Sequence, residues 1–316
     1  MHHIISDGVS VNILMKDLSR LYEGNEPDPL SVQYKDYAVW QQSDIQKRNI
    51  KSQEAYWLDQ FRDDIPVLDI PADYERPAVR DYEGESFEFV IPEHLKQGLS
   101  QMEENTGATL YMILLAAYTI LLSKYSGQED IVVGTPSAGR NHLDVESVVG
   151  MFVNTLVIRN QPAGRKTFDA YLNEVKENML NAYKNQDYPL EELIQHLHLS
   201  KDPSRNPLFD TMFVLQNLDH AELTLDSLQL KPYQFHHPVA KFDLTLSIQA
   251  DQDNYQGLFE YSKKLFKKSR IEALSNDYLH ILSAILEQPS ILIEHIGLSG
   301  SYEEQENMLD SIQLNF

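Results

Sequence analysis

The sequence predicts a mixed α/β fold built around an open, partly antiparallel sheet. In the middle of the chain, strand-like apolar segments alternate with segments of helical periodicity. Toward the end, strand-like segments follow one another directly, which favours antiparallel pairs over a strictly doubly wound parallel sheet. A length of 316 residues and a hydrophobic fraction of 42% suit two compact lobes.

The first part of the chain is expected to be helical. Ser10 is a candidate N-cap, and the apolar residues that follow it at helical spacing predict a helix over 11–22. Two polar-rich helices are expected over 33–48 and 51–63. The proline-bearing segment 66–77 follows them and is the best candidate for a linker.

The middle of the chain contains its most apolar stretch, Leu110–Leu122. A strand is expected over 86–91, and helices are expected over 92–105 and 109–125. Because a membrane span needs about 20 apolar residues, this shorter stretch is interpreted as a buried core helix.

The remaining elements alternate and then cluster as strands. They are expected as strands over 130–136 and 150–159, helices over 167–184 and 189–197, strands over 209–217, 223–230, 242–249 and 255–262, and a helix over 267–287. Beyond Leu298 the periodicity is lost and the charge increases, which predicts an exit linker.

Composition excludes several classes of function. The 26 basic and 48 acidic residues give a net charge of −22, which disfavours binding to nucleic acid or to an anionic membrane. The chain has no cysteine, so it has no disulfide framework, no thiolate metal site and no cysteine nucleophile. A cysteine-free chain fits a cytoplasmic protein.

The opening stretch MHHIISDGVS (1–10) carries the candidate chemistry. His2 and His3 are adjacent, and Asp7 and Gly8 follow just before the first expected helix. A histidine in a turn, a glycine N–H and an aspartate are the parts of a histidine-assisted acyl transfer. Adjacent histidines bind metal poorly and no HExxH spacing occurs, so no metal site is predicted. Polar residues near a chain end remain the alternative interpretation.

This opening stretch resembles the HHxxxDG signature of condensation domains of nonribosomal peptide synthetases, a family related to chloramphenicol acetyltransferase. Further segments resemble the family's core motifs in the expected order. They are YKDYAVW (34–40), VGTPSAGR (133–140), VGMFVNTLVIR (149–159), NQDYPLEELI (185–194), KDPSRNPLFD (201–210) and VAKFDLTL (239–246). Ordered matches over two thirds of the chain make this resemblance specific.

The resemblance implies a two-lobe, chloramphenicol acetyltransferase-like sandwich with open mixed sheets. It places the remainder of an incomplete N-terminal lobe at 1–70, a C-terminal lobe at 71–298, and the start of a linker toward an adenylation domain at 299–316. Since the family's first lobe begins before the two histidines, the 316 residues alone are expected to be inactive.

The implied reaction is peptide-bond formation, in which the amine of an acceptor aminoacyl thioester attacks the carbonyl of a donor thioester. By resemblance, His3 is the catalytic histidine and His2 is mostly structural. Asp7 is expected to form a bidentate pair with Arg140 rather than to orient the histidine. Gly8 is expected to permit close backbone approach and to offer an N–H group to the oxyanion, and a plain turn glycine is the open alternative.

Three further residues are candidates for substrate binding. Asn154 follows the family's FVN pattern, and Tyr37 and Trp40 lie at helical spacing, although structural roles are an open alternative for all three. The resemblance implies no cofactor or metal bound by the domain, because partner carrier domains bring the phosphopantetheine arms. The expected partners are donor and acceptor carrier domains and a downstream adenylation domain.

Three other functions are alternatives to this one. An epimerisation domain shares HHxxxDG but would show a glutamate where this chain has TPSAGR (135–140). A coenzyme-A-dependent acyltransferase would need cationic groups for the nucleotide phosphates, which an acidic chain supplies poorly. A non-catalytic scaffold or recruitment module is the third alternative.

Overall fold

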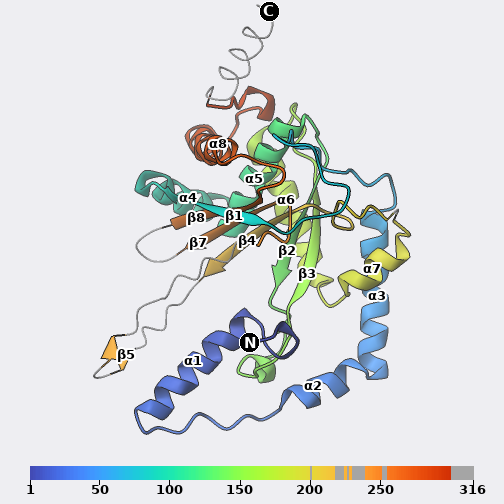
Figure 1. Cartoon of the computed structure of the whole chain (residues 1–316), viewed down its shortest axis with the longest axis vertical. Coiled ribbons are helices and arrows are strands. Elements are labelled where there is room, and N and C mark those ends of the chain that lie inside the picture. The colour runs from blue at the N-terminus through green and yellow to red at the C-terminus, as the bar shows by residue number, and fades with distance from the viewer. Residues whose placement is uncertain (200, 218–223, 226–227, 230–238, 251–254, 300–316) are drawn as a thin grey trace, which may run out of the picture.

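The computed structural model describes residues 1–199, 201–217, 224–225, 228–229, 239–250 and 255–299 (Figure 1). At its centre is a six-stranded sheet with the strand order β1-β8-β7-β4-β2-β3. The strands are β1 (Gly84–Ile91), β2 (Ile131–Ser137), β3 (Asn154–Asn160), β4 (Thr211–Asn217), β7 (Leu244–Ala250) and β8 (Tyr255–Ser262).

The sheet is mixed and open. β8 pairs antiparallel with both β1 and β7, whereas β4 lies parallel to β7 on one side and to β2 on the other. β2 and β3 pair antiparallel, and their register places Ser137 opposite Asn154 at one end of the sheet. The predicted fold class is therefore confirmed, and the loop that joins these two residues lies at that end.

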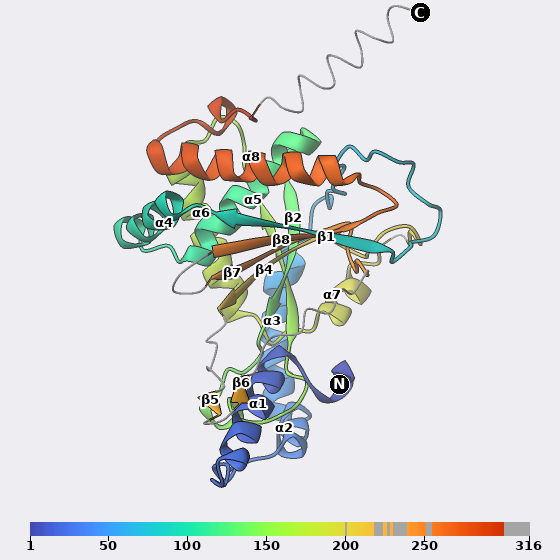
Figure 2. The same ribbon diagram turned by 60° about the vertical axis from the view of Figure 1, so that its left-hand side comes forward.

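Four helices form a layer on the sheet. Figure 2 shows α4 (Glu93–Thr106), α5 (Leu110–Ser126), α6 (Phe168–Lys184) and α8 (Lys268–Glu287) beside the strands. Every residue of α5 from Met112 to Ser123 is buried, which confirms the predicted core helix. No single described helix is long and apolar enough to cross a membrane, and the one pair that meets this criterion together, α4 with α5, is bent by 110°.

The first helices lie apart from this layer. α1 (Gly8–Tyr22) and α2 (Tyr34–Gln41) lie beyond the Ser137 end of the sheet, and α3 (Asp44–Gln60) leads back toward it (Figure 1). α3 packs against α7 (Leu190–His196), which places the first part of the chain beside the β3 edge.

Two helix boundaries differ from the prediction. Asp7, not Ser10, is the N-cap of α1, because its carboxylate accepts the Ser10 N–H and its own backbone is extended. The break between α2 and α3 lies at Gln42 and Ser43 rather than near residue 50. Ser43 determines this break, since its hydroxyl accepts the Gln46 N–H as an N-cap.

Two strand predictions also change. β3 begins at Asn154 and not at residue 150, because the backbone of 150–152 bonds to side chains near the N-terminus. In place of one strand over 223–230, the described residues form the short antiparallel pair β5 (Thr224–Leu225) and β6 (Leu228–Gln229). The predicted exit linker, apart from Ser299, lies outside the described residues.

The segment between α3 and β1 contains the predicted linker. Arg270 of α8 binds Asp73 with an Nη2–Oδ1 distance of 2.8 Å, and both side chains are nearly buried. Arg76 forms an ion pair with Asp243, next to β7. Two partly buried ion pairs thus anchor this irregular segment to the sheet and its helices.

Candidate active site

The two histidines form the entry to α1. A short 3₁₀ turn, η1, spans His3–Ile5, and His2 caps it because its Nδ1 accepts the Ile4 N–H at 3.1 Å. The hydroxyl of Ser6 donates to the His2 carbonyl at 3.2 Å. His2 therefore supports the turn through its side chain and its backbone.

The His3 ring is exposed and held by one hydrogen bond. Its Nδ1 lies 2.8 Å from the carbonyl oxygen of Ser6. A carbonyl only accepts hydrogen bonds, so Nδ1 carries the proton, and in the neutral ring the lone pair is on Nε2. The turn thus presents His3 as a proton acceptor toward the exterior.

Asp7 has the opposite environment, because its side chain is only 3% exposed. Its carboxylate accepts the Ser10 N–H at 2.8 Å and the Ser10 hydroxyl at 2.7 Å. It also accepts the Phe152 N–H at 3.1 Å and the guanidinium of Arg140 at 3.0 Å. These partners belong to α1 and to the loop between β2 and β3, so Asp7 joins the two.

Arg140 is the expected ion-pair partner, and the pair is present with one difference in geometry. Nη2 alone contacts both carboxylate oxygens of Asp7, at 3.0 and 3.2 Å. Nη1 is occupied by the carbonyls of Val145 and Val148, each at 2.6 Å, so the predicted bidentate fork does not form. The guanidinium also stacks 4.1 Å from the centre of the Phe152 ring.

The protonation of Asp7 follows from these contacts. Burial by itself raises the pKa of the carboxyl. The hydrogen bonds from Ser10, from the Phe152 backbone and from Arg140 together outweigh burial and hold the pKa of Asp7 below its usual range. Asp7 is therefore an anion at neutral pH and neutralises the buried guanidinium.

Two glycines allow the loop between β2 and β3 to approach this pair. A Cβ on Gly139, where φ is +64°, would lie 2.0 Å from the Phe152 carbonyl oxygen. A Cβ on Gly150 would lie 2.0 Å from the ring of Tyr34, whose hydroxyl donates to the Met151 carbonyl at 2.8 Å. Side chains at these two positions would displace the loop from Asp7.

Gly8 is different, because open space surrounds it. Among the described residues, no atom beyond its chain neighbours and the backbone of α1 lies within 4 Å of the position that a Cβ would take. Gly8 is the first residue of α1, and its N–H has no acceptor among the described residues. The position therefore offers both a free donor and room for a ligand backbone.

Asn154 lies at the end of β3 and supports a neighbouring turn. Its Nδ2 donates to the carbonyls of Gln186 and Tyr188, at 2.8 and 2.9 Å, and its Oδ1 accepts the Thr155 N–H. Both amide hydrogens thus have protein acceptors in this conformation. The predicted contact between Asn154 and substrate stays a prediction.

Tyr37 and Trp40 line a cavity of about 430 Å³ together with residues of the loop that carries Arg140. The Tyr37 ring packs 4.6 Å from Phe152 and 5.7 Å from Trp40, which is half exposed. His3 does not line this cavity. Tyr37 therefore packs against the Arg140 loop, and the predicted contact of both aromatic residues with substrate stays a prediction.

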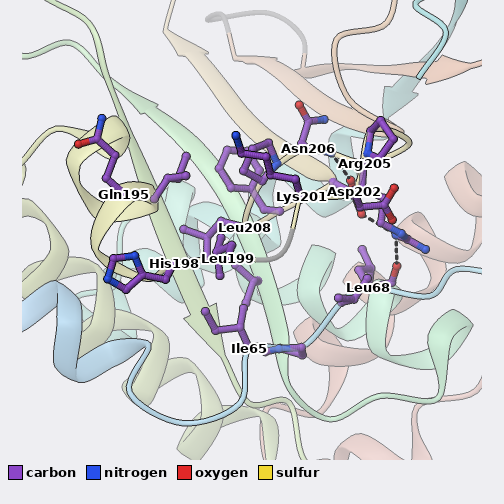
Figure 3. Close-up of a pocket in the computed structure, with 18 residues that line it drawn as sticks. Ile65, Leu68, Gln195, His198, Leu199, Lys201, Asp202, Arg205, Asn206 and Leu208 are labelled. Carbon is purple, nitrogen blue, oxygen red and sulfur yellow. Dashed lines mark hydrogen bonds and ion pairs between the residues drawn. The ribbon is translucent and has the colours of Figure 1, made fainter. Parts of the chain in front are cut away.

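A larger cavity of about 970 Å³ was not predicted (Figure 3). It is lined by Ile65 and Leu68 between α3 and β1, by His198 and Leu199 after α7, and by most residues of the segment 201–210. Figure 3 shows Arg205 and Asn206 at one side, where Arg205 donates to the Leu68 carbonyl and to Asp210. No single motif signals this cavity, because its walls come from three parts of the sequence that lie far apart: residues 65–68, Val132, and residues between 194 and 210.

Among the described residues, no three His, Asp or Glu side chains lie close enough together to hold a metal ion. The site consists instead of an exposed imidazole on a capped turn, a free helix N–H and a buried Asp–Arg pair. On an open mixed sheet, these features are the parts that a histidine-assisted acyl transfer would use.

The chain belongs to the condensation domain family, whose pattern matches residues 1–309. It is 49% identical to gramicidin S synthase 2 of Brevibacillus brevis over 98% of the chain and 7% of that protein. It is also 48% identical to tyrocidine synthase 3 of Brevibacillus parabrevis, over 98% of the chain and 5% of that protein. The chain thus spans less than a tenth of the length of these curated relatives.

Solved structures share the fold. A holo four-domain nonribosomal peptide synthetase bound to AMP and glycine superposes with a TM-score of 0.83 at 23% identity, over 96% of this chain and 24% of that one. The X-domain in its complex with OxyB from teicoplanin biosynthesis superposes with a TM-score of 0.81 at 23% identity, over 94% of this chain and 68% of that one. The fold of the described residues is therefore that of condensation and related domains.

Proposed function

We propose that this chain forms peptide bonds between two carrier-bound thioester substrates, as one domain of a nonribosomal peptide synthetase. The observation that carries the proposal is the His3 turn, in which Nδ1 is bound to the Ser6 carbonyl and Nε2 is left to accept a proton. Membership of the condensation domain family and 49% identity to a peptide synthetase support the same reaction.

The chemistry needs an acceptor for one proton. A free α-amine has a pKa of about 7.7–8, so roughly a tenth or more is already neutral near pH 7. Its nitrogen attacks the thioester carbonyl, the tetrahedral intermediate loses a proton to Nε2 of His3, and the C–S bond then breaks. The imidazolium returns the proton to the leaving thiolate. His3 thus positions the amine and transfers the proton.

Two further groups complete the proposed site. The Gly8 N–H, which has no acceptor among the described residues, can donate to the oxyanion that develops on the thioester carbonyl. The Asp7–Arg140 pair acts structurally, because all contacts of the carboxylate lie on the side of α1 and the loop. Substrates arrive on donor and acceptor carrier domains through phosphopantetheine arms, and the domain itself binds no cofactor.

A condensation assay with two loaded carriers tests this proposal. The protein is mixed with one donor-loaded and one acceptor-loaded carrier. We expect it to form the amide, detected by mass spectrometry, and His3→Ala to abolish amide formation.

The same assay separates the alternatives. Inversion of the donor α-carbon without amide formation would indicate an epimerisation domain. A protein that binds both loaded carriers but forms no product would support a recruitment module. Turnover with free acyl-coenzyme A in place of the donor carrier would indicate a coenzyme-A-dependent acyltransferase.

A further inference from the structure

We infer that Ser10 is a positioning residue. Its hydroxyl fixes the position of the His3 turn relative to the loop between β2 and β3. Ser10 is fully buried, in the first turn of α1. This inference rests on the proposed function, because it assigns Ser10 a role in the same reaction.

The Ser10 Oγ atom has polar neighbours on three segments. It lies 2.7 Å from Asp7 Oδ1 at the cap of α1 and 3.1 Å from Nη2 of Arg140. It also lies 2.8 Å from the carbonyl oxygen of Gly150 and 3.0 Å from its backbone nitrogen. One buried oxygen atom therefore contacts the cap of α1, the arginine that follows β2, and the loop that leads into β3.

The donors and acceptors around this atom show that a hydroxyl is required. A serine hydroxyl has one hydrogen and two acceptor lone pairs. The Gly150 N–H and the Arg140 N–H fill the two lone pairs, and the single hydrogen is directed to Asp7 or to the Gly150 carbonyl. Alanine would leave both N–H donors without this acceptor in a buried site, where an unsatisfied donor is costly.

The connection to His3 runs through the backbone. Ser10 fixes the Asp7 carboxylate and, with it, the start of α1. Ser6, which precedes Asp7, supplies the carbonyl that binds Nδ1 of His3. Gly150 lies four residues before Asn154, the first residue of β3. The Ser10 hydroxyl contacts Gly150, and it therefore ties the position of the His3 turn to the sheet.

This role differs from general support of the loop. Tyr34 also bonds the loop, since its hydroxyl donates to the Met151 carbonyl, but among the described residues it forms no hydrogen bond with Asp7 or Ser10. Ser19 lies on the same helix, and among the described residues its hydroxyl donates to the Met15 carbonyl alone. Tyr34→Phe and Ser19→Ala therefore remove one hydroxyl each without removing the Ser10 contacts.

The test compares Ser10→Ala, Tyr34→Phe and Ser19→Ala in the protein that gives turnover. The first readout is ¹⁵N NMR of labelled histidines, with the His3 signal assigned by its loss in His3→Ala. We expect Ser10→Ala to convert His3 from the single Nδ1–H tautomer to a mixture, whereas both other variants keep the wild-type signal. This readout holds whether or not the protein forms peptide bonds.

The second readout is the kinetics of amide formation at a temperature where circular dichroism shows every variant folded. We expect Ser10→Ala to lower kcat on the order of 10²-fold and to change KM for the acceptor carrier by less than about twofold, since a misplaced reacting group slows the chemical step. A wild-type tautomer together with wild-type kcat in Ser10→Ala would overturn the inference. Equal effects of Ser10→Ala and Tyr34→Phe on the His3 signal would also overturn it.

Discussion

His3 and Asp7 lie four residues apart in the opening motif, yet their side chains have opposite surroundings. His3 is exposed and, among the described residues, its ring is hydrogen-bonded through Nδ1 alone, whereas Asp7 is buried among donors from Ser10, Arg140 and Phe152. A proton acceptor must reach a substrate, and a buried carboxylate needs a cation beside it. The surroundings of His3 thus suit the proposed proton transfer, and those of Asp7 suit the proposed structural role.

Replacing Asp7 by asparagine is expected to destabilise the fold. The change leaves the Arg140 guanidinium without its counter-ion, and breaking a buried pair costs about 3–5 kcal/mol. Urea denaturation at pH 7 measures the loss. An Asp7→Ala protein that folds with wild-type stability but forms no amide bond would contradict the structural role.

The dependence of the unfolding free energy on pH in the acid range gives a second test of the role of Asp7. Its folded-state pKa is lowered, so its contribution to stability is complete above the unfolded-state pKa of about 3.9 and is lost as pH falls through the lower folded-state value. The difference in unfolding free energy between wild type and Asp7→Asn should therefore be constant near neutral pH and shrink below about pH 4.

Gly8→Ala is expected to affect amide formation rather than stability, which is the opposite of the effect expected for Asp7→Asn. The added methyl group enters open space at the first position of α1, so stability should change by less than about 1 kcal/mol. If a substrate backbone approaches here, amide formation should fall at least about tenfold. Gly297→Ala, where a Cβ also meets no atom, is the matched control. Unchanged turnover in Gly8→Ala would show that nothing approaches this residue.

Among the elements, the packing of β2 explains Gly134, the first glycine of the VGTPSAGR segment. A Cβ on Gly134 would lie 2.2 Å from the ring of Phe209, which is buried and stacked on Phe242. The aromatic ring thus occupies the space that any other side chain would need. The glycine is a packing requirement at the centre of the sheet.

Gly134→Ala is therefore expected to destabilise the protein through overpacking, by about 1–3 kcal/mol. Thermal unfolding followed by circular dichroism measures the loss. Gly98→Ala in α4 is a graded control, because its Cβ would meet Leu286 at 3.0 Å, a milder contact. A Gly134→Ala protein as stable as Gly98→Ala would show that the Phe209 ring moves aside at little cost.

The element boundaries show the limits of periodicity. The pattern of apolar residues placed α1, α4, α5, α6 and α8 within a few residues of their observed positions. The break between α2 and α3 was misplaced, because it depends on one side chain, Ser43, bonding to one N–H group. Apolar spacing carries no information on such a cap when the flanking segments are polar.

For the whole molecule, electrostatics follows from the net charge of −22. Like charges repel one another more in the compact state than in the unfolded chain. Raising NaCl from about 10 to about 150 mM shortens the Debye length from about 30 to about 8 Å, so the melting temperature should rise. Differential scanning fluorimetry measures this, and a fall in Tm with salt would mean that ion pairs such as Asp73–Arg270 outweigh the repulsion.

Much of the candidate site was predictable from the sequence because it is local. His2, His3, Asp7 and Gly8 lie in one ten-residue stretch, and the family resemblance named Arg140 as the partner of Asp7. The contacts of Ser10 were not predictable, since they depend on Gly150, 140 residues away. The large cavity beside Leu68 likewise joins segments that no motif connects.

The sequence by itself determined the class of sheet, the buried helix α5 and the histidine turn, because periodicity, apolar runs and short motifs act between near neighbours in the chain. Only the tertiary structure decided the order of the strands, the single-nitrogen contact of Arg140 with Asp7, and the engagement of the Asn154 amide by a neighbouring turn. These features depend on which distant groups compete for the same donors and acceptors, and that competition is settled only when the segments pack together.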